Sequence, residues 1–359
     1  MSFVMFAIGL VALIVGAQFL VRGASKLALS FGISPLVLGL TVVAFGTSAP
    51  ELAVSVRAAW GGQVDIAMGN VVGSNIFNIL FILGVSALIT PLVVAPQLIR
   101  QEVPVMLGAS LLLFALALDG GIGRMDGALL FGLLVMYIVF LIRQSRAESK
   151  ATQDEYAREF AAPVVDGWDR HWSMQLMLIA GGLVLLVLGS TWLVDAAVTF
   201  ARALGLSEMV IGLTIVAFGT SLPEVATSLV AALRGDRDIA VGNVIGSNTF
   251  NILGVLGVSS LVAPAELPVA QAMLSFDMLV MIAVALACLP IFFTGHEISR
   301  WEGALFLGYY VVYMSFLLLA AQQHDAVATY GPVMLTVVLP LTALTLAVLA
   351  ARHWRGRHR

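Results

Sequence analysis

The chain has 359 residues, of which 60% are hydrophobic and only 11% are charged. Soluble domains have about 45–50% apolar and about 25% charged residues, so this composition excludes an ordinary water-soluble protein. A net charge of −3 and two lysines outside any glycine-rich phosphate-binding motif exclude nucleic-acid and nucleotide partners, and a single cysteine, Cys288, excludes a disulfide framework.

Apolar runs separated by charged or Gly/Pro-rich breaks predict eleven membrane-spanning helices. About 20 apolar residues cross a hydrocarbon core about 30 Å thick. Helices are preferred to strands because every backbone group in lipid must be hydrogen-bonded within its own segment. In chain order the predicted spans are 3–21, 33–58, 66–90, 103–118, 126–142, 173–200, 206–232, 238–262, 272–293, 301–320 and 327–350. The expected fold class is an all-α polytopic membrane protein.

The basic residues predict the orientation. When the loops are placed on alternating sides of these spans, 15 of the 18 Lys and Arg residues collect on one side, and only Arg57, Arg124 and Arg202 lie on the other. Because cytoplasmic loops carry the Lys/Arg excess, the N-terminus is expected outside and the C-terminus in the cytoplasm. The expected location is the plasma membrane, which is the inner membrane of a bacterium.

Two segments of the chain are duplicated. GLTVVAFGTSAPELAVS at 39–55 recurs as GLTIVAFGTSLPEVATS at 212–228, and GNVVGSNIFNIL at 69–80 recurs as GNVIGSNTFNIL at 242–253, both at an offset of 173 residues. The sequence thus divides into a five-helix repeat (1–142), a cytoplasmic linker (143–172), a second repeat (173–320), and an extra helix with a basic tail (321–359). Since five is odd, the second repeat is inverted, as in many secondary transporters with a site near the bilayer midplane.

Each repeat contains a predicted helix break. The hexapeptides GTSAPE (46–51) and GTSLPE (219–224) lie about halfway along apolar spans. Pro50 removes the donor for the Gly46 carbonyl, and Pro223 does the same for Gly219. Irregular backbone at this depth is tolerated only where it is buried in protein or lines a wet cavity.

The breaks carry oxygen ligands. Hydroxyl groups and carboxylates are oxygen donors of the kind that hard cations such as Ca²⁺ prefer. The hydroxyls belong to Thr47, Ser48, Thr220 and Ser221, and the carboxylates to Glu51 and Glu224.

The next span of each repeat adds neutral donors. Ser74 and Asn78 lie one helical turn apart on one face, and Ser247 and Asn251 do the same in the second repeat. For Asn75 and Asn248 the sequence leaves ion ligation and helix-to-helix hydrogen bonding open. The glycines at 69, 73, 242 and 246 predict close helix packing in both repeats.

The two carboxylates set the expected charge of the site. Glu51 and Glu224 are the only acidic residues placed near a span centre, where a charge costs a few kcal/mol. Together they give −2, which matches one Ca²⁺ or two Na⁺, and a third Na⁺ would make an exchange electrogenic. Two bare carboxylates repel, so the empty site should take up protons or cations. The alternative is that each glutamate is a protonated packing residue or a cap.

At these residues the sequence resembles the calcium/cation antiporter superfamily, specifically its bacterial sodium/calcium exchanger-like branch. The resemblance rests on the paired GTSxPE and GSNxxN segments and covers nearly all of 1–320. It implies a ten-helix core of two inverted halves that exchanges Ca²⁺ for Na⁺ or H⁺ by alternating access, with no cofactor and no enzymatic activity. The ion ligands it implies are Glu51, Glu224, Thr47, Ser48, Thr220, Ser221, Ser74, Asn78, Ser247 and Asn251, with the carbonyls of Ala44 and Ala217.

Ca²⁺/Na⁺ exchange is the leading expectation, and three alternatives stay open. Asn78 and Asn251 are both amides, whereas much of the sodium-driven branch has one aspartate there, so H⁺/Ca²⁺ exchange is the alternative within the class. A passive cation channel is the second, and a membrane scaffold without transport is the third. About thirty linker residues are too few for a regulatory β-sandwich. The sequence does not indicate the oligomeric state or the role of the eleventh helix.

Overall fold

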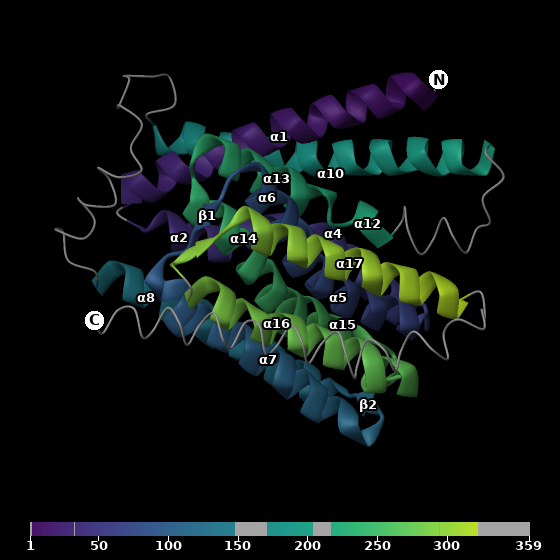
Figure 1. Cartoon of the computed structure of the whole chain (residues 1–359). Helices are drawn as coiled ribbons and strands as arrows, with labels where there is room; N and C mark the ends of the chain where they lie inside the picture. The colour runs from purple at the N-terminus through teal and green to yellow at the C-terminus, as the bar shows by residue number, and fades with distance from the viewer. Residues whose placement is uncertain (1, 32, 148–170, 204–216, 294, 322–359) are drawn as a thin grey trace.

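The computed structural model describes residues 2–31, 33–147, 171–203, 217–293 and 295–321. These residues form almost exclusively helices (Figure 1). The eleventh predicted span, most of the linker and the first part of the span at 206–232 lie outside the described residues.

The first repeat begins with one long helix and continues with interrupted ones. Several are broken by π-helical turns (η1, η2 and η3) or by a 3₁₀ turn (η4). Its elements are α1 (Ser2–Phe31), α2 (Pro35–Leu38), η1 (Gly39–Val43), α3 (Ala44–Thr47), α4 (Ala49–Trp60), α5 (Val64–Phe77), η2 (Asn78–Leu83), α6 (Gly84–Ile89), β1 (Leu92–Val93), η3 (Leu98–Glu102), α7 (Val103–Leu116), η4 (Ala117–Asp119), β2 (Gly121–Ile122) and α8 (Arg124–Ala147).

The second repeat has the same order of elements. Its described elements are α10 (Trp172–Ala203), α12 (Ala217–Gly219), α13 (Leu222–Arg234), α14 (Arg237–Phe250), η6 (Asn251–Leu256), α15 (Gly257–Val262), β3 (Leu267–Pro268), η7 (Met273–Asp277), α16 (Met278–Phe293), β4 (Glu297–Ile298) and α17 (Arg300–Ala321). The π-helical turns η2 and η6 begin at the equivalent residues Asn78 and Asn251.

The described helices are long and apolar enough for a polytopic membrane protein. Eight candidate spans lie within the described residues, or nine if the pair Pro35–Thr47 and Ala49–Trp60, which is bent by 46°, is one span. The span at Arg237–Val262 is buried along its length, whereas most of Arg300–Ala320 is not buried by the other described residues. The span predicted at 103–118 needs a correction, because its helix starts at Leu98 and includes the fully buried Glu102.

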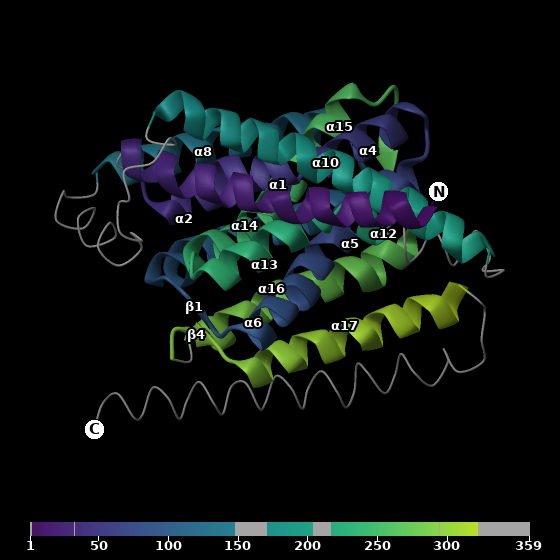
Figure 2. The ribbon, with the colours of Figure 1, turned by 90° about the horizontal axis from the view of Figure 1, so that it is seen from above.

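The two long helices α1 and α10 run antiparallel in close contact along their length (Figure 2). A Cβ atom added to Gly16 would lie 2.8 Å from the carbonyl oxygen of Gly182, and one added to Gly182 would lie 2.7 Å from that of Gly16. Gly9 and Gly189 meet in the same way two turns away. Glycine at these positions lets two backbones touch, which is how helices associate in lipid.

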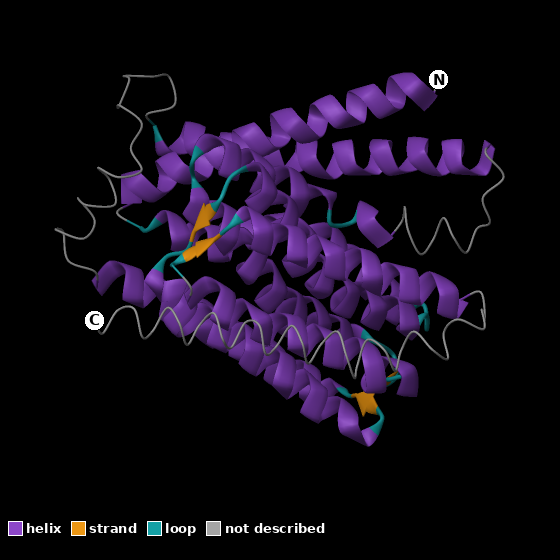
Figure 3. Ribbon diagram, in the orientation of Figure 1, coloured by secondary structure: helices purple, strands orange, loops and turns teal. Residues whose placement is uncertain are grey.

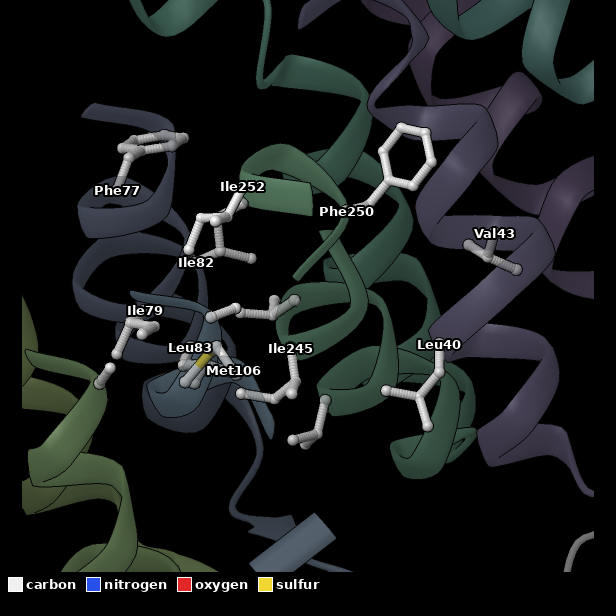
Figure 4. Close-up of a cluster of buried hydrophobic side chains, with 14 of the residues drawn as sticks. Leu40, Val43, Phe77, Ile79, Ile82, Leu83, Met106, Ile245, Phe250 and Ile252 are labelled. Atoms are coloured by element: carbon white, nitrogen blue, oxygen red, sulfur yellow. The ribbon is translucent and has the colours of Figure 1, made fainter. Parts of the chain in front are cut away.

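The centre of the bundle is formed by α14 and the interrupted helices around it. Apolar side chains from η1, η2, α7 and α14 fill this core (Figure 4). A Cβ on Gly246 would lie 2.7 Å from the carbonyl oxygen of Leu40, so the predicted close approach at this glycine is confirmed. The equivalent neighbours of Gly69 and Gly73 fall in 209–217, which is largely outside the described residues, so that prediction stays untested.

Two short strand pairs join loops of the two repeats (Figure 3). β1 pairs with β4, with Leu92 opposite Ile298, and β2 pairs with β3, with Ile122 opposite Leu267. The two pairs lie at opposite ends of the bundle (Figure 3). Each pair therefore ties an end of one repeat to an end of the other.

Candidate cation site between the two helix breaks

Each predicted break is present as an interruption of one or two residues, Ser48 in the first repeat and Thr220–Ser221 in the second. Ser48, with φ −80° and ψ 7°, separates α3 from α4, and Ser221, with φ −88° and ψ 8°, occupies the equivalent position before α13. Pro50 and Pro223 lie in the first turn of the following helix, where a backbone N–H has no intrahelical partner and proline is tolerated. The carbonyl of Gly219, which the sequence predicted to lack its donor, accepts a hydrogen bond from the hydroxyl of Ser190 on α10.

The two carboxylates are buried, and each is bonded to the other half of the protein. Neither Glu51 nor Glu224 has any exposed surface. Ser221 Oγ donates to Glu51 Oε1 at 2.8 Å, and Ser48 Oγ donates to Glu224 Oε1 at 3.1 Å. Because each serine belongs to the opposite repeat, the two breaks face each other inside the bundle and neither acid points into lipid.

Predicted hydroxyl donors surround this crossing. Ser221 Oγ also lies 3.3 Å from Ser74 Oγ, and Thr47 Oγ1 lies 3.5 Å from Ser247 Oγ. Ser74 and Ser247 are buried. The structure thus brings the break of each repeat next to the Ser/Asn helix of the other repeat.

Four buried oxygen atoms among the predicted ligands lack a donor. Among the described residues none donates a hydrogen bond to Oε2 of Glu51, Oε2 of Glu224, Oδ1 of Asn78 or Oδ1 of Asn251. The amide nitrogens of the two asparagines are engaged, since Asn78 Nδ2 donates to Asn248 Oδ1 at 2.9 Å and Asn251 Nδ2 donates to Asn75 Oδ1 at 3.2 Å. Buried oxygens normally have a partner, so this donor set fits a cation that accepts oxygen ligands.

Two of the remaining predicted ligands, Ala44 and Thr220, already make hydrogen bonds within the protein. The Ala44 carbonyl accepts from Ser48 N at 3.0 Å and from Thr47 Oγ1 at 3.3 Å. Thr220 is half-buried and donates to Asn70 Oδ1 at 3.4 Å. Ala217 is the first residue of α12, and its role stays a prediction.

Asn70 and Asn243 are part of the site, although the sequence analysis did not select them. Asn70 Nδ2 donates to Ser55 Oγ at 2.9 Å and to the Glu51 carbonyl at 3.2 Å. Asn243 accepts from Thr47 Oγ1 at 3.1 Å and donates to Ser228 Oγ at 3.0 Å. Both asparagines lie within the duplicated GNVxGSN segments, so the repeat contained the signal that identifies them.

Within the described residues, no group of three or more His, Cys, Asp or Glu side chains could hold a metal ion. Glu51 and Glu224 are the acidic residues among the predicted ligands, and the other predicted ligands are neutral.

The family model described as "Sodium/calcium exchanger protein" matches residues 1–143 and 174–319. The chain belongs to the sodium/calcium exchanger family. The match covers both repeats of this exchanger and stops on either side of the predicted linker.

Individual relatives agree with this assignment. The exchanger is 41% identical over 315 residues to "Putative antiporter CaxA" of Alkalimonas amylolytica, across 86% of this chain and 96% of the relative. It is 35% identical over 345 residues to "Sodium/calcium exchanger MaX1" of Methanosarcina acetivorans, across 88% and 98% of the two chains. Among solved structures it matches the sodium-calcium exchanger NCX_Mj with a TM-score of 0.74 and 34% identity, across 88% and 97% of the two chains. The chain is thus a polytopic membrane antiporter and not an enzyme.

Proposed function

We propose that this exchanger moves Ca²⁺ against Na⁺ across the membrane by alternating access at the site between the two helix breaks. The observation that carries the proposal is the set of four buried, donor-free oxygens, two from the glutamates and two from the asparagine amides. Calcium takes six to eight oxygen ligands, and carboxylates and amide carbonyls are its usual protein ligands.

The proposed ligands come in pairs, and each pair has one residue from each repeat. Its centre is the pair Glu51 and Glu224, which the cation would share. The supporting donors are the hydroxyls of Thr47, Ser48, Thr220, Ser221, Ser74 and Ser247, the amide oxygens of Asn78 and Asn251, and the carbonyls of Ala44 and Ala217.

The charge balance supports exchange between Ca²⁺ and Na⁺. Two ionised glutamates neutralise one Ca²⁺ or two Na⁺, so the two cations compete for the same oxygens. A third Na⁺ would leave a charge of +1 and make the cycle electrogenic. Inverted repeats supply two related packings of the same parts, which open the site to opposite sides of the membrane in turn.

Proton-driven exchange is the second candidate. The amides at both Asn78 and Asn251 favour it. An aspartate at one of these positions would give Na⁺ a third carboxylate, and this chain lacks that carboxylate. Two carboxylates that neutralise Ca²⁺ can also carry two protons, so the same site supports either counter-ion.

The decisive experiment is Ca²⁺ flux into sealed proteoliposomes with Na⁺ and pH gradients clamped independently. When an outward Na⁺ gradient is imposed, we expect Ca²⁺ to accumulate inside against its own electrochemical gradient. A passive channel cannot produce such accumulation. Accumulation that follows the pH gradient and ignores Na⁺ would favour the proton-driven alternative.

Substitution of the acids tests the site itself. Glu51→Gln and Glu224→Gln should each abolish coupled flux. Glu302→Gln is the matched control, because Glu302 is a buried glutamate that caps α17 through Ser299 and glutamine keeps such a cap. Unchanged coupled flux in both site variants would contradict the proposed mechanism.

A further inference from the structure

Four asparagine side chains form a hydrogen-bonded cluster next to the site. This amide cluster consists of Asn75, Asn78, Asn248 and Asn251, all of which are buried. Its two crossing bonds are Asn78 Nδ2 to Asn248 Oδ1 and Asn251 Nδ2 to Asn75 Oδ1. Each bond joins one repeat to the other, and the offset of 173 residues relates the two bonds to each other.

Acceptor-only atoms fix the direction of the first bond. Asn248 Nδ2 donates to the backbone carbonyl of Asn75 at 3.2 Å and to Met106 Sδ at 3.5 Å. A carbonyl and a thioether only accept, so the amide nitrogen of Asn248 must face them. Its oxygen then faces Asn78, which must answer with its own nitrogen, and the oxygen of Asn78 is turned away from the cluster.

The second bond is fixed in the same way. Asn75 Nδ2 lies 3.6 Å from Met281 Sδ, another acceptor-only atom. The oxygen of Asn75 therefore faces Asn251 and binds its nitrogen, which leaves Asn251 Oδ1 free. Met106 lies in the apolar core shown in Figure 4.

We propose that Asn75 and Asn248 are positioning residues that hold the amides of Asn78 and Asn251 with their oxygens presented to the cation. This inference rests on the proposed function and adds to it the residues that set cation affinity. Without these bonds the NH₂ group of Asn78 or Asn251 could turn toward the cation, which it repels, and binding would then have to reorient the amide. Asn75 and Asn248 thus act on binding without touching the ion.

The first test is Ca²⁺ binding to the full-length protein in detergent, measured by titration calorimetry in Na⁺-free buffer. Asn248→Leu removes the acceptor for Asn78 while keeping a similar volume. We expect its Kd for Ca²⁺ to rise about tenfold to a hundredfold, the usual effect of losing a residue that orients a metal ligand. Asn75→Leu should do the same through Asn251.

A second background separates orientation from general damage. Asn78→Asp replaces the amide by a carboxylate, which presents oxygen whichever way it turns. In this background Asn248→Leu should not raise Kd by more than about threefold, because there is no orientation left to lose. The equivalent pair, Asn75→Leu in Asn251→Asp, repeats the test from the other repeat if the first variant does not fold.

Ser260→Ala is the control, because Ser260 is buried and, among the described residues, its hydroxyl donates to the Leu256 carbonyl one turn earlier and to no site residue. The Kd of this variant should not change. If Asn248→Leu causes equal losses with and without the Asn78→Asp substitution, Asn248 is a packing residue, which would overturn the inference while leaving the site intact. An unchanged Kd in both leucine variants would also overturn it. A wild-type protein that binds no Ca²⁺ would overturn the proposed function as well.

Discussion

Proton competition follows from the chemistry of the two buried glutamates. A carboxylate binds a metal ion only when it is deprotonated, so metal binding releases any proton that the site holds. We therefore expect the Kd of the exchanger for Ca²⁺ to rise as the pH falls. The measurement is a series of Ca²⁺ titrations at decreasing pH, in buffers of different ionisation enthalpy that count the released protons.

Glu51→Gln sharpens this prediction. The variant has one carboxylate left at the site, so any Ca²⁺ binding that remains should release fewer protons and depend less steeply on pH. A Kd that does not vary with pH in the wild type would show that protons do not compete for these oxygens.

The two methionines beside the amide cluster should differ in importance. Asn248 keeps the Asn75 carbonyl as an acceptor when Met106 is replaced, whereas the sulfur of Met281 is the acceptor that orients Asn75. Met281→Leu should therefore weaken Ca²⁺ binding more than Met106→Leu does. Each variant is the other's control, since both substitutions are nearly volume-conserving. The reverse order of the two Kd values would contradict the orientation argument.

Sequence reasoning placed the two glutamates at the helix breaks but could not predict their hydrogen bonds. Glu51 and Glu224 stood out because ionisable residues at mid-membrane are expensive. The crossing of Ser48 to Glu224 and of Ser221 to Glu51 depends on how the two repeats dock, and no local pattern encodes that. Asn75 and Asn248 were ambiguous for the same reason, because their partners lie in the other repeat.

At the scale of elements, the contact between α1 and α10 depends on glycine. Gly182→Leu should force the two backbones apart, because the new side chain would meet the backbone of Gly16 and Leu20. We expect a loss of about 3 kcal/mol or more, the upper range for overpacking. The measurement is the thermal unfolding midpoint of the protein in detergent.

Gly181→Leu is the matched control in the same helix. Among the described residues nothing lies within 4 Å of a Cβ built at Gly181, so leucine there should keep or raise the midpoint. Equal losses in the two variants would mean that the helix, and not its contact with α1, is sensitive to substitution.

The π-helical turns could not be predicted from the sequence. They start at Asn78 and Asn251 and recur in η3 and η7, yet their residues read as ordinary apolar helix. Such turns are frequent at functional sites because they redirect side chains within a helix. The start of the span at Leu98 was missed because Arg100 and Glu102 resemble a loop, whereas Glu102 is buried and bonded to Tyr137, Gln97 and Gln101.

At the scale of the whole molecule, the strand pairs bear on the inverted arrangement. The offset of the repeat relates β1 to β3 and β2 to β4, so the pair β1–β4 is the counterpart of the pair β3–β2. Each pair contains one loop from each repeat, and the positive-inside assignment places both loops of a pair on the same side of the membrane. If the second repeat were not inverted, equivalent loops would lie on the same side of the membrane, and β1 would lie on the side of β3 instead of the side of β4.

This arrangement predicts which loops are accessible from outside the cell. Gln63 and Ala265 lie in loops assigned to the outside, and Arg100 and Arg300 lie at helix starts assigned to the cytoplasm; all four are exposed. Single cysteines at these positions, in a Cys288→Ala background, report the side through a membrane-impermeant maleimide. Cys288 is buried, so its removal only eliminates background labelling.

On intact cells that express the exchanger, we expect labelling at positions 63 and 265 and none at positions 100 and 300 until the membrane is permeabilised. Position 63 is equivalent to position 236 of the second repeat, whose loop carries Arg234 and Arg237 and is assigned to the cytoplasm. Arg234 of this loop is exposed, so a cysteine at this position should behave as the opposite of one at Gln63. Labelling of both from the same side would mean that the repeats are parallel, and two parallel halves cannot place their helix breaks face to face in opposite directions around one cation.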